Sequence, residues 1–362
     1  MDKLQANTTH IATALCIEGK KLWRWYRDVL SGFLEQSSQD ELHQYDFQTK
    51  VGNGTRLVQV PILKQENIGP NMAIDEKKIG EEMHTVLTNR DSGKIALLAS
   101  TLKSGELAGL AVHFDLKGFD VKTITRDLSN SYDWFCRQAF PNAEHIADKF
   151  HIIKAVLDAH QDVRIRHRQD LLRERRLEHE AHKQAEKLRK QQCAMEEKPY
   201  VPRKFKEKET KFANGETALE MLARSRYLLF KFPGEWTATQ KERAEIMFEK
   251  FPQIRTAYHL ACSFRTWYRK ENIAKDEKDI NTRLTAWYRE VEQADIDEMS
   301  NVKSLIERHQ PFITNYFHNG HTNAIAENIN GKIKRFININ QGTRDRDFFY
   351  FRLKNFFAST SK

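Results

Sequence analysis

The order of the elements predicted for residues 71–148 constrains the fold of this chain more than any other sequence feature. Three short apolar segments come first, and Arg90-Asp-Ser-Gly93, a sequence typical of a hairpin turn, separates the second from the third. Two helices follow, each leading into a further strand. The predicted strands are residues 72–75, 82–89, 94–101, 121–127 and 144–148, and the predicted helices are residues 105–114 and 131–140.

This β-β-β-α-β-α-β order predicts an antiparallel meander followed by two right-handed parallel crossovers. It is the plan of a ribonuclease-H-like fold, although other α/β domains share the order alone. We therefore predict an α/β (α+β) protein built on a ribonuclease-H-like mixed sheet.

Helices are predicted for most of the remaining chain. Residues 1–45 form short helices, residues 150–192 form one long charged helix, and residues 217–317 are almost wholly helical. A turn-rich connector around a short strand, residues 56–62, and a basic linker, residues 198–211, join these parts. Aromatic residues recur through 236–287, a pattern more typical of a packed core than of a stacking platform. Thr237, with Gln240 three residues later, predicts a capping box.

Charge and cysteine content narrow the class of protein. The chain has 59 basic and 50 acidic residues, a formal net charge of +9, which favours a polyanionic partner without establishing one. Its four cysteines lie far apart with no Cys-x-x-Cys pair, which argues against a disulfide framework or a cysteine-rich zinc module and suits the reducing cytosol. No apolar run approaches the roughly 20 residues of a membrane span.

Two helices carry basic residues that could contact DNA. In the N-terminal segment these residues are Lys20, Lys21 and Arg24, which are compatible with a helix-turn-helix. The alternative is a helical hairpin that packs on the core. In the long helix the excess of arginine includes Arg164 and Arg168, which could bind phosphates or could belong to a solvated face.

Two aspartates occur at the predicted ends of parallel strands. Asp75 ends the first strand and Asp127 ends the fourth, so their carboxylates are expected to converge at one edge of the sheet. Such a pair is repulsive unless a cation or a proton lies between them, and oxygen ligands favour Mg²⁺ or Mn²⁺. A strand-end aspartate can also be a helix cap, and Asp115, Asp120 and Asp148 compete for the same role.

A polar stripe is predicted on the C-terminal helix, opposite an apolar face of isoleucines. Its members are Asn323, Glu327, Asn330 and Lys334, at helical positions i, i+4, i+7 and i+11. Amide, carboxylate and ammonium groups in one line could ligate a metal and hold phosphates. The alternative is a solvated face, but asparagine and glycine are costly inside a helix for that purpose alone.

Four ordered motifs resemble those of the DDE transposases of the insertion-sequence L-three family, over roughly residues 71–357. Asp75-Glu76 resembles the first acidic motif, and Asp127 followed by Tyr132 resembles the second. Pro141-Asn-Ala143 with Asp148-Lys-Phe-His151 is similar to a further signature of the family. The segment from Thr322 to Arg335 resembles the closing glutamate motif, with Gly342 and the aromatic run 348–351 after it.

The resemblance implies a ribonuclease-H-like catalytic domain that a helical insertion interrupts ahead of the glutamate. The expected divisions are residues 1–50, helical and compatible with a helix-turn-helix; 51–190, the first part of the catalytic domain with the long basic helix; 191–310, the insertion; and 311–362, the part with the glutamate helix. Asp75, Asp127 and Glu327 are the expected ligands of two Mg²⁺ or Mn²⁺ ions. Lys332, Lys334 and Arg335 are expected near phosphates, and His151 and Asp148 in supporting positions around the ligands, with a structural core histidine as the rival role for His151.

The expected partner is double-stranded DNA, with a homodimer that pairs two element ends. Members of the family usually carry a cysteine-rich zinc segment that this chain lacks, so either a separate zinc-type protein recognises the ends or this copy is truncated. A cytoplasmic, nucleoid-associated transposase of a prokaryote is the expected protein. Two alternatives remain open: an inactive DNA-binding remnant, and another ribonuclease-H-like nuclease that performs no strand transfer.

Overall fold

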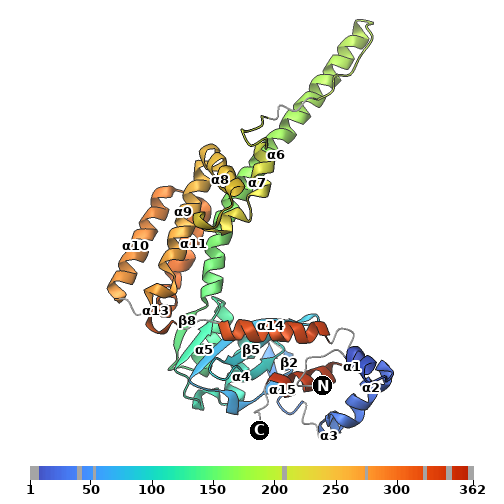
Figure 1. Cartoon of the computed structure of the whole chain (residues 1–362), viewed down its shortest axis with the longest axis vertical. Helices are drawn as coiled ribbons and strands as arrows, with labels where there is room; N and C mark the ends of the chain where they lie inside the picture. The colour runs from blue at the N-terminus through green and yellow to red at the C-terminus, as the bar shows by residue number, and fades with distance from the viewer. Residues whose placement is uncertain are drawn as a thin grey trace. The chain divides into compact units, whose positions relative to one another are not determined.

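The computed structural model describes residues 8–38, 43–51, 54–205, 210–273, 276–320, 324–339 and 345–357 (Figure 1). The chain divides into two compact units. The first comprises Met1–His151 and His309–Lys362, and the second comprises Ile152–Arg308. The first unit is therefore discontinuous in sequence, because the second is inserted into it.

The first unit is built on a six-stranded mixed sheet with the order β3-β6-β5-β4-β7-β8. The strands are β3 (Ile62–Leu63), β4 (Asn71–Ile79), β5 (Glu82–Asn89), β6 (Ile95–Ala99), β7 (Thr123–Arg126) and β8 (Glu144–Ala147). Strands β3 to β6 pair antiparallel, whereas β7 is parallel to both β4 and β8. This confirms the predicted meander and crossovers, although β4 is longer than the predicted 72–75.

Helices cover both faces of this sheet (Figure 1). On one face, α4 (Ser104–His113) and α5 (Asn130–Ala139) pack in a cluster that includes Leu87 and Ile74. On the other, α14 (Ala324–Ile339) and α15 (Arg346–Phe357) pack in a cluster that includes Val86. Neighbouring residues of β5 enter opposite clusters because side chains alternate along a strand. The predicted ribonuclease-H-like α+β class is confirmed.

Short N-terminal helices pack on α15. They are α1 (Thr8–Ala14), α2 (Gly19–Trp25), a π-helical turn (Tyr26–Leu30) and α3 (Phe33–Ser38), and the hairpin β1 (Phe47–Val51) and β2 (Gly54–Val58) follows. Tyr26 and Phe33 are buried against Phe348 and Phe351 of α15. An aromatic cluster thus joins the beginning of the described chain to its end.

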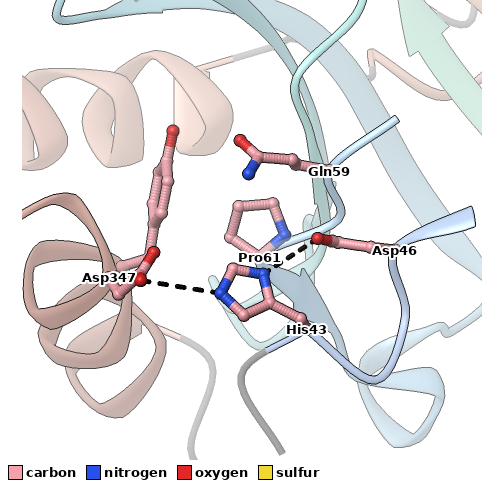
Figure 2. A pocket seen from close by; sticks show the side chains of 6 residues that line it. His43, Asp46, Gln59, Pro61 and Asp347 are labelled. Carbon is pink, nitrogen blue, oxygen red and sulfur yellow. Dashed lines mark hydrogen bonds and ion pairs between the residues drawn. The ribbon is translucent and has the colours of Figure 1, made fainter. Parts of the chain in front are cut away.

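Ion pairs at the start of α15 reinforce this packing. Arg27 Nε donates to Asp345 Oδ2 at 2.7 Å. His43 lies between two carboxylates, with its Nδ1 2.9 Å from Asp46 and its Nε2 3.6 Å from Asp347 (Figure 2). The hydrogen bond to Asp46 is the main reason that the pKa of His43 is raised, and Asp347 raises it further.

The second unit is all-helical in its described residues. Its helices are α6 (Lys149–Met195), which begins in the first unit, α7 (Ala218–Arg224), α8 (Ala238–Lys250), α9 (Pro252–Trp267), α10 (Glu277–Ala294) and α11 (Asp297–Arg308). Tyr258, Phe264 and Trp287 are buried, as expected for an aromatic core. The capping box of Thr237 and Gln240 starts α8, as predicted.

Shorter elements complete the description. Helices α12 (Gln310–Thr314) and α13 (Tyr316–Asn319) belong to the first unit, and single 3₁₀ turns occur at Gln65–Asn67, Leu116–Gly118, Leu228–Phe230, Pro233–Glu235 and Lys270–Asn272. Asn315, which follows α12, donates to the main-chain oxygen of His145 in β8 at 2.8 Å. Within the described ranges, none of the helices has the length and apolarity needed to cross a bilayer.

The His43 contacts predict a pH-dependent contribution to stability. Because the pKa of His43 is raised in the folded chain, its contribution is fully present below the ordinary histidine pKa and is lost as the pH rises through the raised value. The stability difference between the wild type and His43→Gln should therefore be larger at about pH 6 than at about pH 8.5. Urea unfolding at the two pH values measures this, and an equal difference at both would contradict it.

Candidate active site

Three aspartates occupy equivalent positions in the register of neighbouring parallel strands, and we describe such residues as level with one another. Ala73 of β4 pairs with Thr125 of β7, so Asp75 and Asp127, each two residues further on, are level in the same register. Arg126 pairs with Ala147 of β8, so the next residues, Asp127 and Asp148, are also level. The competing Asp115 and Asp120 precede β7 and belong to its amino end.

Asp75 lies on the face of the sheet that α14 covers. Its neighbour Ile74 enters the cluster with α4 and α5, and successive side chains point to opposite faces. Asp75 Oδ1 accepts the main-chain N–H of Glu76 at 2.8 Å, and its Oδ2 accepts Asn330 Nδ2 at 2.5 Å. The contact to Asn330 joins β4 directly to α14.

The three carboxylates influence one another electrostatically. Burial is the main reason that the pKa of Asp75 is raised, and the negative charges of Asp148 and Asp127 raise it further. The hydrogen bond from Glu76 and the nearby His151 act in the opposite direction. Ionised Asp75 is therefore destabilised where it lies, so a positive charge beside it would be favoured.

Asp127 and Asp148 also cap the segments that follow them. Asp127 Oδ1 accepts the N–H of Ser129 at 2.8 Å, and Asp148 Oδ1 accepts the N–H of Phe150 at 2.9 Å. These bonds fix the direction of both carboxylates, because each aspartate bonds its own backbone two residues on. Capping and ligation are compatible roles, since each bond uses one carboxylate oxygen.

His151 lies close to this group of acids. Its Nε2 is 3.6 Å from Asp148 Oδ2, and its side chain is 39% exposed. It is therefore a half-exposed histidine beside the acids rather than one enclosed in the core.

The predicted Glu327 belongs to α14, three residues before Asn330, but its side chain lies outside the described residues, and Asn323 lies outside them entirely. Helix α14 is fastened to the sheet by Ile329, Ile333 and Phe336, which are buried. Glycine at position 331 leaves open space where a side chain would stand.

One basic side chain of α14, Lys334, lies near Lys77 of β4, which is itself near Asp75. Burial is the main reason that the pKa of Lys77 is lowered, Lys334 lowers it further, and Asp75 raises it. Lys332 and Arg335 are exposed on the same helix. This side of the site therefore combines carboxylates with ammonium groups.

The other predicted DNA contacts fall into two groups. Lys20, Lys21 and Arg24 are exposed on α2, where the Lys21 ammonium lies 4.8 Å from the Trp25 ring centre. Arg164 belongs to the second unit and is buried, where it donates to the Leu222 carbonyl at 2.7 Å and holds α6 to α7. Arg168 is half-buried on the same helix.

Arg126 is a site residue that the sequence analysis missed. Its guanidinium is 1% exposed, donates to the Asp127 carbonyl at 3.0 Å and to Asp133 Oδ1 at 2.5 Å, and lies 4.7 Å from the ring centre of Phe312. It therefore braces the strand end that presents Asp127. The available signal was an arginine at the last position of the strand, directly before the predicted ligand.

The donor set fits a hard divalent cation. The side chains of Asp75, Asp127 and Asp148 offer only carboxylate oxygens, which are the ligands that Mg²⁺ and Mn²⁺ prefer. The raised pKa of Asp75 marks a repulsion that such a cation would relieve. Considering only the described side chains, which do not include that of Glu327, no three His, Cys, Asp or Glu residues lie close enough together to hold a metal ion.

Arg126→Ala is expected to lower the free energy of unfolding by about 3 kcal/mol, because it removes a buried guanidinium and leaves Asp133 and the Asp127 carbonyl without it. The matched control is Arg137→Ala, since Arg137 also bonds Asp133, at 3.0 Å, but is 56% exposed. That change should cost less than about 1 kcal/mol. Urea unfolding compares the two, and equal losses would contradict the bracing role.

Comparison with known protein families assigns this chain to a family. The family model of DDE transposases of the ISL3 type, described as "Transposase", matches residues 72–353. Neither the curated proteins nor the solved structures gave a significant match. The matched range extends from β4, with Asp75, to α15, and covers most of the chain. The protein is a transposase that belongs to the ISL3 family of DDE transposases.

Proposed function

We propose that this transposase cuts DNA at the ends of an insertion sequence and joins the cut ends to target DNA, with Asp75, Asp127 and Glu327 as its catalytic carboxylates. The observation that carries the proposal is the common level of Asp75 and Asp127 on parallel strands, together with the raised pKa of Asp75. Glu327 is included because it lies one helical turn from Asn330, which bonds Asp75.

Asp75, Asp127 and Glu327 would hold two Mg²⁺ or Mn²⁺ ions, which in such sites lower the pKa of water and stabilise the leaving oxygen. The chain itself orients the ligands. Asn330 fixes one oxygen of Asp75, and the cap at Ser129 fixes one oxygen of Asp127. Lys334, and Lys332 and Arg335 beside it on α14, would balance the charge that develops on the phosphoryl oxygens.

The reaction would proceed in two displacements at phosphorus. Water attacks a phosphodiester at the element end, the P–O3′ bond breaks, and the released 3′ oxygen takes up a proton. That 3′-hydroxyl then attacks a target phosphodiester, forming one P–O bond as another breaks. Both steps exchange one oxygen for another at phosphorus, so no covalent bond to the protein is required.

The remaining expectations form part of the proposal. The DNA substrate would be double-stranded, and a homodimer would hold the two ends. A separate zinc-type protein could recognise the end sequence, and the chain would act at the bacterial nucleoid. The predicted catalytic parts, 51–190 and 311–362, would then flank the insertion 191–310. Lys20, Lys21, Arg24, Asn323 and Arg168 would serve as DNA contacts, and Asp148 and His151 as supporting groups beside the ligands.

Metal binding predicts a thermal shift. Mg²⁺ in excess of its dissociation constant should raise the Tm of the wild-type chain by roughly 2–5 °C, because a ligand that binds only the folded state stabilises it. Asp75→Asn should lose this shift, whereas Asp120→Asn, which alters a 76% exposed acid paired with Lys122, should keep it. A full Mg²⁺ shift in Asp75→Asn would remove Asp75 from the ligand set.

Cleavage and joining test the catalytic assignment. Asp75→Asn, Asp127→Asn and Glu327→Gln should each lower Mg²⁺-dependent cleavage of end DNA by at least about 10³-fold while DNA binding survives, because metal-ligand carboxylates act in the transition state. Asp120→Asn is the control. Retained cleavage by any one variant excludes that residue from the triad, and loss with Asp148→Asn instead of Asp127→Asn would transfer the role to Asp148.

A joining assay with pre-cut ends and supercoiled target separates the proposed reaction from its alternatives. The proposal expects joined product. A nuclease without strand transfer would cut the ends and join none, and an inactive DNA-binding remnant would do neither.

A further inference from the structure

We propose that the second unit carries a DNA-backbone binding surface, the basic–aromatic patch, formed by Arg226, Tyr227, Phe232, Arg265 and Arg269. It goes beyond the proposed function because none of its residues is among the DNA contacts proposed above, and its unit contains none of the proposed catalytic residues. The proposal depends on the family assignment only for the identity of the anionic partner, which is DNA.

Two aromatic rings position the arginines of the patch. Phe232 lies under two of them, with its ring centre 4.0 Å from the Arg265 guanidinium carbon and 4.7 Å from that of Arg269. The Arg226 guanidinium lies 5.6 Å from the ring centre of Tyr227, which is 70% exposed. Stacking on a ring limits the freedom of a long side chain while its N–H groups stay available.

Hydrogen bonds hold the loop between α7 and α8, which carries Arg226, Tyr227 and Phe232. Gln161 of α6 donates to the Arg226 carbonyl at 3.1 Å, and Tyr258 of α9 donates to the Lys231 carbonyl at 2.7 Å. Trp236 Nε1 donates to the Leu228 carbonyl at 2.8 Å. These bonds anchor the backbone that carries Arg226 and Phe232 on two helices, and Arg265, which stacks on Phe232, belongs to one of those helices, α9.

The positive charge of the patch is not neutralised by carboxylates. Across the described part of the chain, Arg226, Arg265 and Arg269 form no ion pair, and Arg265 donates instead to the Phe230 carbonyl at 3.0 Å. Glu235 accepts the N–H of Phe232 at 2.7 Å and pairs with none of these three.

Other arginines of the same unit behave differently. Arg166 pairs with Glu298 at 2.7 Å, and Arg224 and Arg243 pair with Glu216 at 2.9 and 2.8 Å. Carboxylates are thus available on this unit, yet the one that reaches the patch, Glu235, accepts a main-chain N–H and pairs with none of the patch arginines. Positive charge that its own chain leaves uncompensated is typical of a surface that meets an anionic partner.

The positive charges of the patch also affect the pKa values of neighbouring residues on α6. Burial lowers the pKa of Arg164, and the charges of Arg226 and Arg168 lower it further. The pKa of buried His160 is lowered to about 4, first by burial, and Arg164 and Arg265 add to that effect. Arg226 and Arg265 of the patch therefore lie near groups of α6, among them Arg164.

DNA is the partner that best fits this chemistry. Planar guanidinium groups bind phosphate oxygens through paired N–H donors, and each contact releases a condensed counterion. The exposed ring of Tyr227 beside Arg226 could add contact with sugar or base. An acidic protein would satisfy the charges alone, and it is an outcome that the experiment can detect.

The test is salt-dependent DNA binding by the full chain. Arg226→Gln/Arg269→Gln should lower the slope of log affinity against log salt by about 2, since each lost phosphate contact accounts for about 0.9. Arg226→Lys/Arg269→Lys should keep most of the slope, because it keeps the charge. Fluorescence anisotropy with a 30-base-pair duplex of arbitrary sequence measures it, and circular dichroism checks that the variants fold.

The matched control removes two exposed charges from α10 of the same unit, in Lys278→Gln/Arg289→Gln, and should leave the slope unchanged. A wild-type slope in the patch variant, or an equal loss in the control, would overturn the proposal. So would unchanged duplex binding with lost binding of polyglutamate, which would indicate an acidic protein. Because binding is measured without Mg²⁺, failure of the cleavage proposal leaves this result unaffected.

Discussion

The repulsion among carboxylates held at one level of the sheet is the constraint on which the rest of the first unit depends. Asp75, Asp127 and Asp148 are brought together by the parallel registers of β4, β7 and β8. Burial and the two neighbouring charges raise the pKa of Asp75. The cation proposed for this site would relieve that repulsion.

The contact between Asn330 and Asp75 joins residues that are 255 positions apart. The sheet is complete only when α14 and α15 return to cover it, because Val86, Ile95 and Leu98 are buried in a cluster with residues of these helices. An insertion of this length is tolerable because the entropy of closing a loop grows slowly with its length. The inserted unit also buries its own aromatic core around Phe264 and Trp287.

Periodicity and turn chemistry predicted most of the catalytic scaffold. Strand β5 has the predicted limits, and α5 begins one residue earlier than predicted. The prediction of a single strand at 56–62 was wrong: a hairpin, β1 and β2, and the separate short strand β3 are found there. Charged residues were harder to place, since Arg126 and Arg164 are buried through hydrogen bonds to main-chain carbonyls that only the folded chain brings near. The assignment of the catalytic triad stays a prediction.

The sequence by itself determined the order of the elements, the family, and the acidic and amide residues that form its motifs, because these depend on local pattern. Only the tertiary structure decided which acids share a level, since register is a property of paired strands. It set Asp148 beside Asp127 and left Asp120 exposed beside Lys122. It also stacked Arg265 and Arg269 on Phe232, because residues distant in sequence meet only when α9 and the loop between α7 and α8 pack together.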